Sequence, residues 1–81
     1  MKNMFKPTTY MVLFWNKDES EVVGGEVYPM HLFSFNDVVE LLRGKEDMCD
    51  IYESRFSKRS GKYITVGNVY TWKNGSWVLQ I

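Results

Sequence analysis

The sequence of 81 residues contains no alanine, one cysteine (Cys49) and one histidine (His31). A single cysteine excludes an intramolecular disulfide and a thiolate metal cluster, because closed zinc sites use four Cys or His ligands. Nucleophiles and bases are equally scarce, so an enzyme built on Cys49 and His31 is the weakest of three functional hypotheses. We therefore expect no catalytic residues, no cofactor and no metal site.

Long apolar runs and targeting signals are missing as well. The longest apolar run, Tyr10 to Trp15, is far shorter than the roughly 20 residues that cross a bilayer. No secretory signal is recognisable at the N-terminus. Ser60-Gly61-Lys62 resembles the end of a phosphate-binding P-loop, but the first glycine that this motif requires would fall at Phe56. We predict a cytoplasmic protein that does not contact a membrane.

What the chain does have is large aromatic side chains, which make up 16% of its residues. Each can bury roughly 150–250 Å², which helps a short chain to form a core. With 25% charged and 44% hydrophobic residues, the composition is that of an ordinary globular protein. We predict one domain over residues 1–81, with residues 1–7 as a loose lead-in because Pro7 cannot donate to a strand ladder.

The N-terminal half predicts a β-hairpin. Residues 8–16 alternate with apolar side chains on both faces, which indicates a central strand covered on each side. One cover would be a helix, and the other would be more of the same chain or a partner. Residues 17–20 form a polar turn, and residues 21–28 return as the second strand. Gly24-Gly25 interrupts that strand as a bulge or, alternatively, as a tight turn.

The middle of the chain predicts one or two helices. Ser34 and Asp37 match a capping box at the start of a helix that Gly44 can end. Residues 45–61 are ambiguous. Apolar spacings of three and four, with acids early and cations late, favour a second helix. The rival interpretation is a strand from Cys49 to Phe56.

The C-terminal third predicts a β-meander. Asn74-Gly75 is typical of a type I′ turn, which would place Trp72 opposite Trp77. Gly67-Asn68 marks either a second tight turn or a bulge after a strand over residues 63–66. The predicted fold is therefore α+β, with a small antiparallel sheet (N-terminal hairpin plus C-terminal meander) packed on one or two central helices.

Charge is segregated along the sequence although the net charge is zero. Every acid lies between positions 18 and 53, where ten acids against Arg43 and Lys45 leave −8. Residues 55–81 carry five cations and no acid, hence +5. Such segregation bears on the choice of partner, provided that the fold keeps the two segments apart.

The acidic set suggests the first function. On a helix, Glu46, Asp50 and Glu53 would share one face with Asp47 beside it. We hypothesise a non-enzymatic protein–protein interaction module, an inhibitor or adaptor, that meets a protein with a basic surface through this face. The compact, aromatic-rich composition would suit a small phage or mobile-element protein that blocks host machinery. A solvated helix face is the simpler alternative.

The basic set suggests the second function. Its cations could bind phosphates and its aromatic ring could stack on bases, which would make a nucleic-acid-binding site. The members of the set are Arg55, Lys58, Arg59, Lys62 and Tyr63. A solvated loop is again the simpler alternative. The apolar strand from Tyr10 to Trp15 and a free sheet edge near the C-terminus also predict a possible homodimer.

Overall fold

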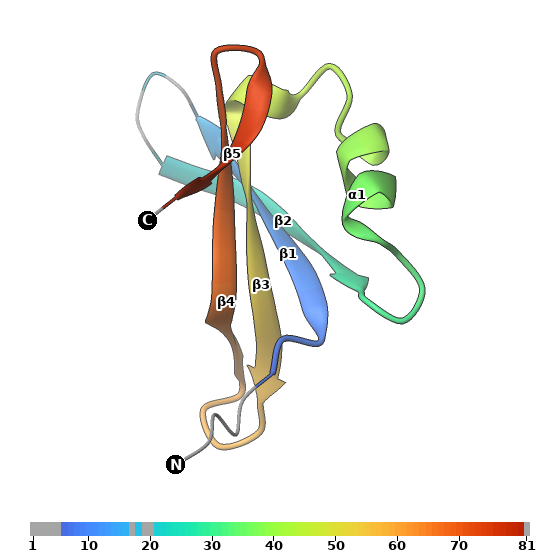
Figure 1. Cartoon of the computed structure of the whole chain (residues 1–81). Helices are drawn as coiled ribbons and strands as arrows, with labels where there is room; N and C mark the ends of the chain where they lie inside the picture. The colour runs from blue at the N-terminus through green and yellow to red at the C-terminus, as the bar shows by residue number, and fades with distance from the viewer. Residues whose placement is uncertain (1–5, 17, 19–20, 81) are drawn as a thin grey trace.

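The computed structural model describes residues 6–16, 18 and 21–80 of the chain. Its elements follow one another as β1 (Thr9–Asn16), β2 (Glu21–Pro29), α1 (Phe35–Leu41), the 3₁₀ turn η1 (Glu46–Met48), β3 (Cys49–Ser57), β4 (Lys62–Lys73) and β5 (Ser76–Gln80). The five strands form one antiparallel sheet in the order β2-β1-β3-β4-β5. Figure 1 shows the strongly twisted sheet with α1 on one side of it.

The predicted fold class is wrong. The molecule is predominantly an antiparallel sheet, and one α-helix of seven residues lies on it. The error comes from residues 45–61, where the predicted second helix is a single 3₁₀ turn followed by the nine-residue strand β3. The rival strand interpretation, from Cys49 to Phe56, was the right one.

Strand pairing explains why β3 prevails over the helical pattern. β3 is bonded to β1 on one side and to β4 on the other, so its backbone has partners along both edges. Ile51, which is completely buried, sits between Val12 and Tyr70. Spacings of three and four in a short apolar segment fit either structure, and long-range pairing decides between them.

The strand pairing of both predicted hairpins is confirmed, whereas residues 17, 19 and 20 of the predicted polar turn lie outside the described residues. β1 pairs with β2, and the register shifts by one residue at Val23, beside Gly24, which is the predicted bulge. Asn74 and Gly75 have φ of 51° and 84° in the β4–β5 turn, and Trp72 pairs with Trp77. The pairing of β3 with β4 is also irregular, and Gly67 lies at this irregularity. β4 continues through Gly67 as one strand, so the alternative of a second tight turn is not formed.

The capping box is also confirmed, and it starts the element that completes the core. The Asp37 amide donates to Ser34 Oγ, and the Ser34 amide donates back to Asp37 Oδ2. The helix then presents Val38, with Leu42 just beyond it, to one face of the sheet. The buried apolar core consists of Val12, Val38, Leu42, Cys49 and Ile51.

Two further expectations concern the ends of the chain and the membrane. Most of the predicted lead-in, residues 1–5, lies outside the described residues, and so does Ile81. Across residues 6–16, 18 and 21–80, no helix combines the length and the apolar character needed to traverse a bilayer.

Candidate functional site

The basic residues lie on a hairpin that extends beyond the rest of the sheet. β1 begins at Thr9, which pairs with Ser54, and β3 and β4 continue past that point as a two-stranded ribbon. Ser57 pairs with Lys62, and residues 58–61 form the turn at the tip. Figure 1 places this tip at the opposite end of the sheet from the β4–β5 turn. We call residues 55–64 the basic hairpin.

Local hydrogen bonds and one glycine shape the tip. The Gly61 amide donates to the Ser57 carbonyl at 2.7 Å, and the Ser60 amide donates to Ser57 Oγ at 3.3 Å. Gly61 has φ of 71°, a backbone conformation that residues with a Cβ adopt at a cost. Ser60 and Gly61, which belong to the Ser60-Gly61-Lys62 segment that resembled the end of a P-loop, therefore form part of a hairpin turn.

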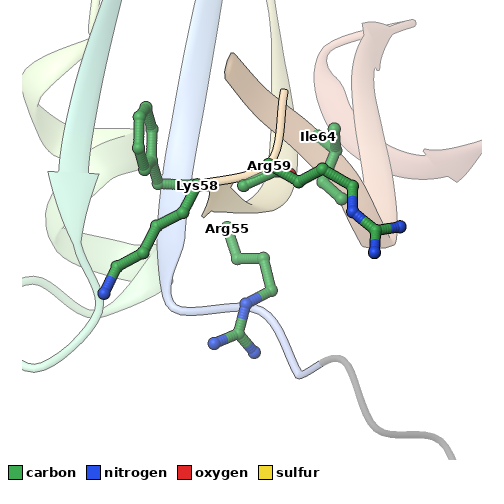
Figure 2. Close-up of a pocket in the computed structure, with 6 residues that line it drawn as sticks. Arg55, Lys58, Arg59 and Ile64 are labelled. Atoms are coloured by element: carbon green, nitrogen blue, oxygen red, sulfur yellow. The ribbon is translucent and has the colours of Figure 1, made fainter. Parts of the chain in front are cut away.

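The hairpin brings together all the cations of the predicted nucleic-acid set. Arg55 lies on β3, Lys58 and Arg59 on the turn, and Lys62 at the start of β4. Arg55 Nη1 also donates to the Lys6 carbonyl at 2.9 Å, which ties the N-terminal segment to the ribbon. In Figure 2 the charged ends of Arg55, Lys58 and Arg59 point in three different directions. This spread suits a chain of anions better than one compact anion.

Aromatic and apolar side chains accompany the cations. Phe56 and Tyr63 are cross-strand partners whose rings meet edge to face at 5.2 Å between centroids. Their exposed fractions are 47% and 38%, high for aromatic side chains. A hollow of about 320 Å³ is lined by Arg55, Phe56, Ser57, Lys58, Arg59 and Ile64. Phe56 was predicted, with Tyr63, as a possible stacking ring, whereas Ile64 was not among the predicted site residues, although its pairing with Arg55 in the hairpin would have placed it there.

The predicted acidic set does not form one face. Glu46 and Asp47 belong to η1, whereas Asp50 and Glu53 belong to β3. Asp50 pairs with Leu13, and Glu53 pairs with Tyr10, whose ring contacts Phe35 of the helix. Leu13 and Tyr10 are an odd number of positions apart in a strand, so the two carboxylates lie on opposite faces of the sheet.

Three of these acids accept hydrogen bonds from within the fold. Glu46 Oε1 accepts the Gly44 amide, and Asp50 Oδ2 accepts Trp15 Nε1, both at 2.9 Å. Glu53 accepts the Asn68 amide at 2.9 Å and the Tyr70 hydroxyl at 3.1 Å. The prediction that one helix presents these four acids together is therefore wrong. The role of the acidic set in binding a partner stays a prediction.

Cys49 and His31 occupy different parts of the molecule. Cys49 pairs with Phe14, whereas His31 follows Pro29, which pairs with Thr9. Phe14 and Thr9, the partners on β1, are about 17 Å apart along that strand. Burial, followed by the charge of Asp50, raises the pKa of the Cys49 thiol to about 11, so the thiolate is scarce at neutral pH. Within the described residues, no group of three His, Cys, Asp or Glu side chains could hold a metal ion.

The basic hairpin is thus the part of the described chain where charge, exposed rings and a hollow coincide. Its cations can neutralise phosphates, and its rings can stack on planar groups. Comparisons with known proteins add no family to this description: no protein-family model, no curated protein and no solved structure matches the chain.

Proposed function

We propose that the protein is a non-enzymatic binding protein for single-stranded nucleic acid, held through the basic hairpin. The observation that carries this proposal is the placing of four cations and two exposed aromatic rings on one projecting ribbon. The cations would contact successive phosphates, and an unpaired base would stack on Phe56 or Tyr63.

A single strand is a better ligand than a duplex for two reasons. Paired bases in a duplex do not offer their faces to an aromatic side chain, whereas unpaired bases do. The cation count of the hairpin is small, and a short flexible strand can follow their divergent directions. The acidic-module hypothesis has less support, since the helix that would present Glu46, Asp50 and Glu53 together is not formed.

The test measures binding of a short fluorescent oligonucleotide by anisotropy over a range of salt. For a single strand the logarithmic salt slope is about −0.7 per phosphate contact, so four contacts predict a slope of roughly −3. Lys58→Ala should weaken binding and reduce the slope by about 0.7. Lys73→Ala, which removes the same charge from the last residue of β4 at the other end of the sheet, is the matched control.

Stacking is tested separately with Phe56→Leu, which keeps an apolar side chain but removes the ring. The expected loss is about 1–3 kcal/mol, or roughly 5- to 150-fold in affinity. A duplex of the same sequence should bind more weakly than the single strand. No binding at low salt, or an equal loss in Lys58→Ala and Lys73→Ala, would contradict the proposal.

A further inference from the structure

Both aromatic rings of the basic hairpin lie on the same face of the sheet. Side chains alternate between the two faces of a strand, so Phe56 shares a face of β3 with Tyr52 and lies opposite the buried Ile51. Tyr63 pairs with Phe56 and therefore shares its face. The helix packs against the face that carries Ile51. The two rings thus belong to the face away from the helix, which we call the open face.

The open face continues from the hairpin to the middle of the sheet. Within the described residues no helix or further sheet covers it, since all five strands form one sheet and the helix lies on the other side. Tyr52 pairs with Met11 and with Val69, and all three side chains are partly exposed. Phe56 follows Tyr52 four residues later, about 13 Å along β3. On this face of β3 only the small side chain of Ser54 lies between the two rings.

Charge limits how far a phosphate chain can extend along this face. The cations of the hairpin lie at one end of β3, and residues 50–54 contain no cation. Asp50 comes two residues before Tyr52 on the same face, and its Oδ2 accepts the Trp15 indole at 2.9 Å. Burial, followed by the charge of Asp50 and a hydrogen bond to it, raises the pKa of the Tyr52 hydroxyl. Phosphates are therefore attracted at the hairpin and repelled beyond Tyr52.

We propose that the single strand held at the basic hairpin continues along β3 over the open face and stacks a second base on Tyr52. The inference rests on the proposed function, because the hairpin supplies the phosphate contacts. Single-strand sites combine a cationic surface with several aromatic rings on which successive bases stack. At about 3.4 Å per stacked nucleotide, the roughly 13 Å between the rings corresponds to about four nucleotides, and to fewer in an extended strand. The base on Tyr52 adds affinity without a phosphate contact of its own.

The first test measures the anisotropy of a fluorescent strand of about ten thymidines, a length within the usual range of such sites. Tyr52→Leu removes the ring and should weaken binding roughly 5- to 150-fold, the effect of one stacked base. Its salt slope should equal that of the wild-type protein, whereas Lys58→Ala lowers the slope. Tyr52→Phe keeps the ring and should bind like the wild-type protein. Tyr28→Leu is the matched control, because the Tyr28 ring contacts Phe33 on the helix side.

Ultraviolet crosslinking of a strand that carries 5-iodouracil tests the same contact in the unmutated protein. Mass spectrometry should find Tyr52 among the crosslinked residues. If Lys58→Ala and Phe56→Leu weaken binding while Tyr52→Leu does not, this inference is overturned and the proposed function stands. If the wild-type protein binds no strand at low salt, both fail. Self-association in sedimentation that Tyr52→Leu abolishes would show that a second copy covers the open face, and would also overturn the inference.

Discussion

At the scale of single residues, the burial of Cys49 has consequences that can be measured. Its side chain is 3% exposed, and its Sγ donates to the Lys45 carbonyl at 3.3 Å. The protonated thiol is favoured in the folded state by removal from water and by nearby carboxylates. The residue therefore behaves as a small core side chain.

Alkaline pH should destabilise the protein through this thiol. Its pKa rises from 9.0 to about 11 on folding, so the stabilising contribution is present below about pH 9 and is lost as pH rises toward 11. Denaturant unfolding across this range should show a falling midpoint. Cys49→Val should flatten that part of the profile, whereas an unchanged profile would contradict the assignment. At neutral pH, native Cys49 should react with thiol reagents only slowly.

The contacts of Glu53 differ from the role that its charge suggested. Its charge made it a member of a proposed binding set, but in the structure its carboxylate accepts two hydrogen bonds from β4. The two donors lie 15 and 17 residues after Glu53 in the sequence. They reach its carboxylate because β3 and β4 are neighbours in the sheet. Charge can be read from sequence, whereas bonding partners this distant cannot.

At the scale of elements, the irregularity in β4 depends on Glu53 and Gly67 together. A Cβ at Gly67 would lie 2.9 Å from the Glu53 Cβ, closer than atoms can pack. Gly67→Ala should therefore displace Glu53 and lose its bond to the Asn68 amide, at a cost of about 1–3 kcal/mol in unfolding free energy.

The control for this prediction is Gly24→Ala, since no atom lies within 4 Å of the equivalent position in β2. Chemical denaturation should find that variant within about 0.5 kcal/mol of the wild-type protein. Equal unfolding free energies for the two variants would mean that Glu53 does not constrain the irregularity.

The helix illustrates how an element can be predicted correctly while its context is not. The capping box is local, because both of its hydrogen bonds join residues three apart. Its start was therefore recognisable from Ser34 and Asp37 alone. The strand after it, β3, takes its identity from neighbours that are distant in sequence, and local spacing was insufficient there.

At the scale of the whole molecule, stability depends on very few side chains. Among the described residues, the five buried apolar side chains come from β1, β3 and the helical segment and form one cluster. Leu42 is 1% exposed and follows the helix directly. It heads the fully buried side chains in size, and it shares the core with Val38 of the helix.

Leu42→Ala should cost about 2–5 kcal/mol, a large part of the stability of a small domain. Leu41→Ala is an internal control, since its side chain is half exposed and the change should cost about 0.5 kcal/mol or less beyond helix propensity. Urea unfolding of the two variants and the wild-type protein measures both losses. Similar losses for the two variants would show that the helix does not complete the core.

The separation of charge is another property of the whole molecule. β3 (Cys49–Ser57) separates Asp47, which lies just before the strand, from Lys58, which lies just after it, by the length of the strand. A helix over the same residues would rise about 1.5 Å per residue and bring the two sets much closer. The strand spacing of about 3.3 Å keeps them apart.

Sequence alone determined the features that depend on near neighbours: the capping box, the Asn74-Gly75 turn, the N-terminal hairpin and the apolar character of both faces of β1. It also determined the order of charge along the chain. Tertiary structure alone decided that residues 49–57 are a strand, and with it the fold class and the dispersal of the acidic set. It also decided that the cations and rings share one hairpin. The physical reason is that hydrogen bonds between strands join residues far apart in sequence, and no local pattern records which partners will be found.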